Sequence, residues 1–167
     1  MNLKHPFISV IIPTYHDWQR LQLCLDAIDT QSYPKEKFEI IVVNNDPLDF
    51  PSGMTWPNNC SVVVESKSGS YAARNKGASH AKGKVFSFTD ADCIPDKNWL
   101  SEIASHYSYN KGILSGSVIM FSMRANNKLN FTESYDYIFG INQEIYKRSK
   151  VAATANLSVT SEEFFFK

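Results

Sequence analysis

The sequence predicts one α/β domain with a mostly parallel β-sheet. Short β-branched apolar runs alternate with segments whose apolar residues recur at helical spacing. The 167 residues, 43% of them hydrophobic, suit one folded domain. Alternating strands and helices form layered sheets with right-handed crossovers. No apolar run approaches the roughly 20 residues of a membrane-spanning helix, so no membrane span is expected.

The first part of the chain predicts two strands separated by a helix. Residues 7–12 form a nearly continuous β-branched run closed by Pro13, which is typical of a buried parallel strand. Asp17 can cap the helix that follows. Residues 38–43 are a second buried strand, and residues 46–59 have the Pro, Gly, Asn and Ser content of a surface loop.

The middle of the chain continues the alternation. Residues 61–65 predict a short third strand, and a helix rich in small residues opens at 68–70 and runs to about His80. Residues 85–89 predict a fourth strand, and residues 97–107 predict a helix with one apolar face.

Three elements are expected in the last part of the chain. Residues 113–121 predict a fifth strand, residues 131–148 one long helix, and residues 156–160 a last strand. Glu162 and Glu163 have the character of the polar start of a further helix.

Net charge and cysteine usage exclude several functions. The 17 Lys and Arg residues balance the 17 Asp and Glu residues. The chain therefore lacks the basic surface of a nucleic-acid-binding protein, and a local site must hold any anion. The three cysteines have no paired metal-ligand spacing and indicate reduced thiols. Because the first residues lack a signal-peptide pattern, we expect a cytoplasmic protein, with the inner face of the membrane as an alternative.

Polar side chains follow each of the first four predicted strands. They are Thr14, Tyr15 and His16, then Asn44, Asn45 and Asp46, then the segment 69–74, and finally Asp90 and Asp92. In open α/β sheets, ligands bind beyond the carboxyl ends of the strands. The sequence therefore predicts a binding site at this edge of the sheet.

Asp90 and Asp92 are the pair at that edge that most strongly indicates a metal site. Two carboxylates this close repel each other unless a cation or a set of donors lies between them. Oxygen ligands in a partly open site suit Mg²⁺ or Mn²⁺ shared with substrate phosphates. The alternative is that Asp90 caps a turn and Asp92 is solvated.

Arg74 lies among small residues near the start of a predicted helix, where anions bind well. It can hold a phosphate or a base carbonyl, or it can pair with a nearby carboxylate at the surface. Thr14 and the turn that begins at Asn44 can bond a base and its ribose. Composition alone favours the alternative for that turn, in which Asn and Asp side chains bond their own backbone.

Four segments in order resemble motifs of the family-2 glycosyltransferases. They are residues 8–15 (ISVIIPTY), 39–44 (EIIVVN), 73–77 (ARNKG) and 88–93 (FTDADC). The resemblance runs from about residue 7 to residue 99 and recurs at residues 155–158 (ANLS).

The resemblance implies a GT-A fold, a Rossmann-like α/β/α sandwich. It also implies inverting transfer of a sugar from a nucleotide-diphosphate sugar, with a UDP-sugar favoured. The acceptor would be a saccharide or a lipid-linked molecule, as in polysaccharide biosynthesis. By motif position, the donor contacts would be Thr14, Tyr15, Asn44, Arg74, Asp90 and Asp92. Asp90 would hold the ribose or the metal, and Asp92 would ligate Mg²⁺ or Mn²⁺ at the diphosphate.

The chain departs from the family pattern at two positions. The family usually has Asp where this chain has Asn44, whose amide oxygen still accepts a hydrogen bond but carries no charge. Position 16, often Asn in the family, is His16, and the sequence alone assigns it no effect.

The resemblance also implies a division of the single domain 1–167. Residues 7–121 would form the nucleotide-sugar-binding half, and residues 122–167 the start of an incomplete acceptor region. The family's catalytic base is expected beyond Lys167, because Glu162 and Glu163 come too early, so we expect a chain truncated at its C-terminus. The alternative function is a noncatalytic module that binds a nucleotide sugar. The oligomeric state stays open.

Overall fold

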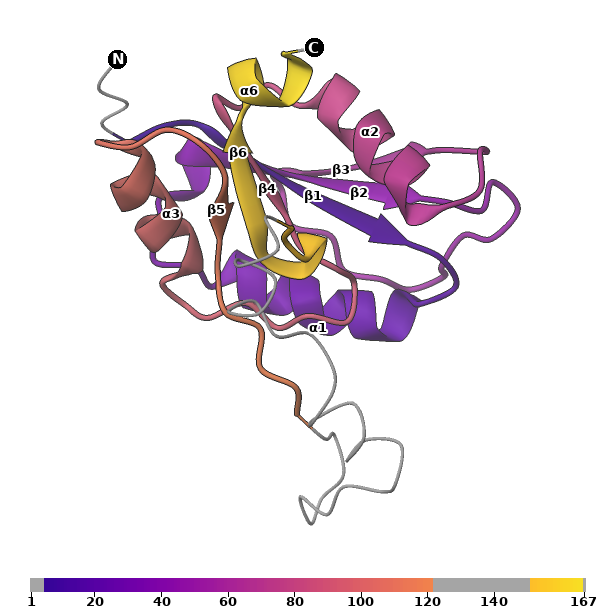
Figure 1. Cartoon of the computed structure of the whole chain (residues 1–167). Helices are drawn as coiled ribbons and strands as arrows, with labels where there is room; N and C mark the ends of the chain where they lie inside the picture. The colour runs from indigo at the N-terminus through magenta and orange to yellow at the C-terminus, as the bar shows by residue number, and fades with distance from the viewer. Residues whose placement is uncertain (1–4, 122–150, 167) are drawn as a thin grey trace.

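A six-stranded sheet with helices on both faces makes up the described part of the chain (Figure 1). The computed structural model describes residues 5–121 and 151–166. The strand order is β3-β2-β1-β4-β6-β5. The helix expected over residues 131–148 lies outside the described residues.

The strands at the centre of the sheet are parallel, as predicted. The strands are β1 (Ile8–Thr14), β2 (Phe38–Asn44), β3 (Cys60–Val64), β4 (Val85–Phe88), β5 (Leu114–Ser115) and β6 (Leu157–Thr160). β1 pairs in parallel with both β2 and β4, and β2 pairs in parallel with β3. β6 runs antiparallel to β4 and β5.

Helices cover both faces of this sheet, which gives the expected α/β/α sandwich. They are α1 (Trp18–Asp29), α2 (Ser70–His80), α3 (Trp99–Tyr107) and α6 (Ser161–Phe165), with short 3₁₀ turns at Lys35–Lys37 and Thr154–Asn156. Figure 1 shows α1 and α3 on one face and α2 and α6 on the other. Within the described ranges, no helix has the length and apolar character needed to cross a membrane.

The alternation of side chains along β1 builds a separate core on each face. Ile8, Val10 and Ile12 pack with residues of α1 and α3, whereas Ile11 packs with residues of α2. All four side chains are fully buried, and the polar residues of this strand, Ser9 and Thr14, are buried as well. The carboxyl end of β1 is thereby fixed at the centre of the sheet.

The fifth expected strand, over residues 113–121, is wrong in its length. Only Leu114–Ser115 pairs as a strand. Beyond it, the Gly116 amide donates to the Asn156 carbonyl oxygen (3.0 Å), and the Asn156 side-chain amide donates to the Ser117 carbonyl oxygen (2.9 Å). Asn156 belongs to a 3₁₀ turn, so no partner strand continues there and Ile119 stays 79% exposed.

The start of α1 differs from the expectation in one detail. Asp17 occupies the position before the helix, but its side chain makes no capping hydrogen bond. Its carboxylate instead pairs with Arg20, with 2.6 Å between Oδ2 and Nη2. Glu162 and Glu163 lie in the first turn of α6, as expected.

Candidate functional site

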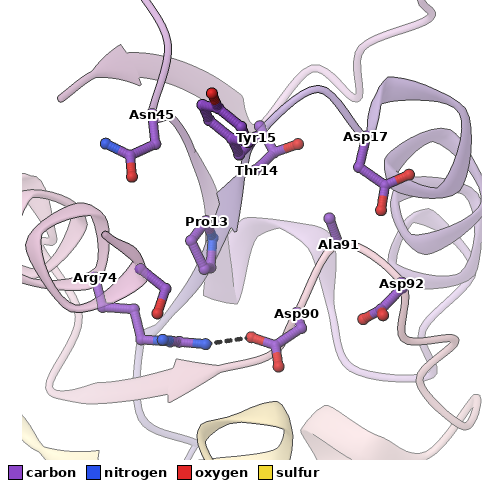
Figure 2. Close-up of a pocket in the computed structure, with 10 residues that line it drawn as sticks. Pro13, Thr14, Tyr15, Asp17, Asn45, Arg74, Asp90, Ala91 and Asp92 are labelled. Atoms are coloured by element: carbon purple, nitrogen blue, oxygen red, sulfur yellow. Dashed lines mark hydrogen bonds and ion pairs between the residues drawn. The ribbon is translucent and has the colours of Figure 1, made fainter. Parts of the chain in front are cut away.

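A pocket of about 330 Å³ lies at the carboxyl ends of β1 and β4, beside the start of α2. Its lining residues are Pro13, Thr14, Tyr15, Asp17, Asn45, Ser70, Arg74, Asp90, Ala91 and Asp92. All the predicted site residues except Asn44 are in this set. Figure 2 shows Arg74 and Asp90 facing each other on one side of the pocket and Asp92 beside Asp17.

Arg74 and Asp90 form an ion pair between α2 and the segment after β4. The pair joins guanidinium Nη2 to carboxylate Oδ1, and the Arg74 side chain is only 14% exposed. Of the two roles considered for Arg74, the structure thus shows the ion pair with a nearby carboxylate. The pair lies in the pocket and not on the open surface.

Two polar atoms at this pocket are buried without a hydrogen-bond partner. They are the hydroxyl Oγ1 of Thr14 and the guanidinium Nε of Arg74. Buried polar atoms normally have a partner, because leaving one unpaired costs about 1–3 kcal/mol. Thr14 itself is only 3% exposed. Both atoms belong to residues that line the pocket.

α2 is held close to the sheet by a glycine. A Cβ atom at Gly77 would lie 2.5 Å from Ile11 Cγ2 and 3.0 Å from Val43 Cγ2. Glycine is therefore required for this approach, which places Arg74, three residues earlier on α2, against the carboxyl end of the sheet. Gly69, with φ +114, precedes the helix and turns the chain into it.

Asp92 is half-exposed and has a cationic neighbour. Its Oδ2 lies 3.4 Å from Nη1 of Arg20, whose stronger partner is Asp17. The hydrogen bond to Asp17 raises the pKa of Arg20. Arg20 was not predicted as a site residue, although its position three residues after Asp17 at a helix start indicates a pair between the two.

The carboxylates provide only part of a metal's coordination shell. Within residues 5–121 and 151–166, no group of three or more His, Cys, Asp or Glu side chains is placed to hold a metal ion. Asp90 and Asp92 nevertheless bring two carboxylates to one pocket. This set fits Mg²⁺ or Mn²⁺, which keep several positions for water and substrate phosphates.

Asn44 lies beneath the pocket rather than in its lining. It is fully buried, and its Nδ2 donates to the Asp49 carbonyl oxygen at 2.7 Å. Its Oδ1 accepts from the Asp46 amide at 3.0 Å. Both amide atoms are therefore used within the turn, as in the structural alternative raised from composition.

Asn45, the next residue, lines the pocket and links β2 to the start of α2. Its Nδ2 donates to the carbonyl oxygens of Glu65 (2.7 Å) and Lys67 (2.8 Å). Its Oδ1 accepts from the Gly69 amide at 2.9 Å. Asn45 thus fixes the loop from which α2 begins, a role that its position after a strand did not reveal.

The thiols near the site have raised pKa values. Cys24 is fully buried, and its thiol donates to the Asp90 carbonyl oxygen at 3.7 Å. Burial raises the pKa of the Cys24 and Cys93 thiols. The three cysteines, all within the described ranges, are free. Neutral thiols are weak nucleophiles, so the chemistry of this pocket belongs to its carboxylates, guanidinium and hydroxyl groups.

The fold and the site are those of the glycosyltransferase class, and the comparison of sequences identifies the family. The Glycosyl transferase family 2 profile matches residues 9–160. The chain belongs to this family.

A curated relative is similar over nearly the whole chain. Glycosyltransferase AglE from Haloferax volcanii is 35% identical over 164 residues, which cover 94% of this chain and 53% of the relative. The chain therefore spans about half the length of this relative.

Solved structures confirm the GT-A fold. The mannosyltransferase PcManGT from Pyrobaculum calidifontis, in complex with GDP-Man and Mn²⁺, matches with a TM-score of 0.63 and 20% identity, over 93% of this chain and 44% of that one. TarS 1-349 from S. aureus, in complex with UDP-GlcNAc, matches with a TM-score of 0.61 and 18% identity, over 93% of this chain and 45% of that one.

Proposed function

We propose that the chain binds the sugar donor of a glycosyltransferase that transfers a sugar from a nucleotide-diphosphate sugar, with a UDP-sugar favoured, to a saccharide or lipid-linked acceptor. Membership of glycosyl transferase family 2 supports the reaction class. The two structural neighbours described above are complexes with GDP-Man and UDP-GlcNAc, which supports a nucleotide sugar as the ligand.

The observation that supports this assignment most directly is the pair of unpartnered atoms, Thr14 Oγ1 and Arg74 Nε. A nucleoside diphosphate offers oxygen and nitrogen acceptors to both. Arg74 also brings guanidinium donors to the pocket, and phosphate oxygens accept bidentate hydrogen bonds from such a group. Tyr15, which is 64% exposed on the pocket wall, offers its ring to a planar base.

Asp92 and Asp90 are the residues that would hold Mg²⁺ or Mn²⁺. Asp92 is the more available of the two, because Asp90 is already paired with Arg74 and Asp92 is half-exposed. A divalent cation there would neutralise charge on the leaving diphosphate. Arg74 acts on the same charge by donating hydrogen bonds, which stabilises the nucleoside diphosphate as the sugar leaves.

We assign donor binding to residues 7–121 and the beginning of acceptor binding to residues 122–167. Transfer would proceed with inversion, since the acceptor hydroxyl would attack the face of the sugar opposite the diphosphate. No described residue is proposed as the base. Glu163 lies close to the C-terminal end of the chain, but its carboxylate already accepts hydrogen bonds from Thr160 Oγ1 (2.7 Å) and the Gly112 amide (2.9 Å).

Calorimetry on the 167-residue chain tests the proposal. UDP, GDP, UDP-GlcNAc and GDP-Man are titrated with and without Mn²⁺. We expect one of them to bind in a metal-dependent manner, and Asp92→Ala to remove the effect of the metal. Asp26→Asn, an exposed carboxylate on α1, is the matched control and should bind as the wild type does. The proposal is rejected if none of the four ligands binds.

A second assay separates the proposal from the noncatalytic alternative. Release of free nucleotide from the bound nucleotide sugar, measured over hours, reports hydrolysis or transfer. Release above the background of the Asp92→Ala variant supports an enzyme. Binding without release supports a module that holds a nucleotide sugar and does not transfer it.

A further inference from the structure

His16 bridges two aspartates from the turn that follows β2. Its Nε2 lies 2.9 Å from Asp46 Oδ2, and its Nδ1 lies 3.1 Å from Asp49 Oδ2. His16 directly follows Tyr15 at the end of β1, so the imidazole links the ends of two neighbouring strands. Thr14 strengthens the same junction, because its carbonyl oxygen accepts from the Asn45 amide at 2.9 Å.

Only one form of the imidazole satisfies both contacts. A neutral imidazole has one N–H donor and one acceptor, so it would place a lone pair against a carboxylate oxygen on one side. The imidazolium form donates from both ring nitrogens and makes two charge-assisted hydrogen bonds. The two contacts therefore match the two donors of an imidazolium, whereas a neutral ring would keep one of them.

The turn that His16 contacts, residues 46–49, is also held by other hydrogen bonds. The Trp18 indole N–H donates to Asp49 Oδ2 at 2.7 Å, and the Leu48 amide donates to Asp46 Oδ1 at 2.9 Å. Asn44, buried below, bonds the backbone of both aspartates. Both carboxylates are thus held in place, and they in turn fix the orientation of the imidazole.

The imidazole ring supports Tyr15 on the pocket wall. The two ring centroids lie 4.2 Å apart with an interplanar angle of 82°, an edge-to-face contact. His16 has φ +55, in the left-handed region that non-glycine residues adopt infrequently but that histidine and asparagine tolerate better than most. This backbone conformation directs the side chains of Tyr15 and His16 so that the exposed tyrosine is backed by the bridged ring.

We infer that His16 is a positioning residue for nucleotide binding: by bridging Asp46 and Asp49, it fixes the Tyr15 ring on the wall of the pocket. This role rests on the proposed function, since Tyr15 matters only if a nucleotide occupies the pocket.

The bridge has a spectroscopic signature that is independent of nucleotide. In the chain labelled with ¹⁵N-histidine, at mildly acidic pH, both ring N–H protons of His16 should be observed because both are hydrogen-bonded. Asp46→Asn should remove the signal at Nε2, and Asp49→Asn the signal at Nδ1. Detection of one ring proton only, or insensitivity to both substitutions, overturns the bridge.

The positioning role is tested by the affinity for UDP or GDP with Mn²⁺, using whichever binds the wild type more tightly. His16→Asn keeps a side chain suited to the left-handed backbone but cannot bridge the two carboxylates. We expect about a fivefold weaker affinity, the scale of one lost hydrogen-bonded contact. His80→Asn, on an exposed histidine at the end of α2 whose ring bonds its own helix, is the matched control and should not change the affinity.

A double-mutant cycle with Tyr15→Leu distinguishes positioning from a merely structural role. If His16 acts through Tyr15, His16→Asn should have almost no further effect in the Tyr15→Leu background. Additive losses, or an unchanged affinity of His16→Asn, overturn the inference while leaving the proposed function intact. If the wild type binds no nucleotide, the proposed function fails, and the positioning role fails with it.

Discussion

The guanidinium of Arg74 on α2 is ion-paired with the carboxylate of Asp90 just after β4. These two residues come from different motifs of the chain, sixteen positions apart. Their side chains are 14% and 32% exposed, so each charge is largely withdrawn from water and compensated by the other. The pair therefore contributes to the stability of the pocket as well as to its charge.

A double-mutant cycle should detect this coupling in the free energy of unfolding. We expect Arg74→Ala and Asp90→Ala each to destabilise the chain by about 1–2 kcal/mol, with a coupling energy near 1 kcal/mol, because each single change leaves a partly buried charge unpaired. Urea unfolding of the wild type, both single variants and the double variant gives the four values.

The Arg20–Asp92 pair is the matched control for that cycle. Its atoms are 3.4 Å apart and its side chains are 54% and 50% exposed. A pair this exposed should show a coupling energy below about 0.5 kcal/mol. Equal coupling in the two pairs would contradict the importance of burial in the Arg74–Asp90 pair.

The sheet and the grouping of site residues could be predicted because local patterns determine them. Residues 8–12 of β1 and 40–43 of β2 are buried on both faces, so every residue of these two runs is apolar or small, and the strands are visible in the sequence. Parallel strands then bring their carboxyl ends to one edge, which is why Thr14, Arg74 and Asp90 meet at one pocket.

The features that the sequence did not reveal depend on contacts between distant segments. The side-chain amide of Asn44 is buried because it forms hydrogen bonds with the backbone of Asp46 and Asp49. The position of Asn44 in a sequence motif does not predict these contacts. The strand expected over residues 113–121 ends early because Asn156 bonds its backbone from a turn. His16 received no role from its neighbours in sequence, since both its partners come from the turn after β2.

Gly77→Ala should destabilise the chain although it replaces glycine within a helix. Helix propensity alone favours the change by about 1 kcal/mol. The added Cβ would lie 2.5 Å from Ile11 Cγ2, however, and such overpacking costs about 1–3 kcal/mol. We expect a lower thermal midpoint by calorimetry and weaker nucleotide binding, because α2 carries Arg74. Asn75→Ala, exposed on the same helix, should instead raise the midpoint slightly, and a rise for both variants would contradict the close packing.

Phe164→Ala should show that α6 is packed on the sheet. The Phe164 ring lies 5.6 Å from the rings of both Phe86 and Phe88, measured between centroids. Losing these partly buried contacts should cost about 2 kcal/mol in urea unfolding. Phe166→Ala, on a side chain that is 88% exposed, should change stability by less than about 0.5 kcal/mol. Equal effects of the two substitutions would mean that α6 does not pack as described.

The stability of the chain should fall above pH 9, in part because of Cys60. Burial raises the pKa of the Cys60 thiol from 9.0 to about 12. Between these two pH values the thiol of the unfolded chain releases a proton that the thiol of the folded chain retains. The free energy of unfolding therefore decreases as the pH rises, until the pH exceeds the pKa of the folded state. Cys60→Ser, which does not titrate there, should lessen the decrease between pH 8 and pH 10 by about 1 kcal/mol in urea unfolding. Ser61→Ala, at the neighbouring position of β3, is the control for local disturbance and should show the same decrease in stability as the wild type. If Cys60→Ser also shows the full decrease of the wild type, burial does not protect this thiol.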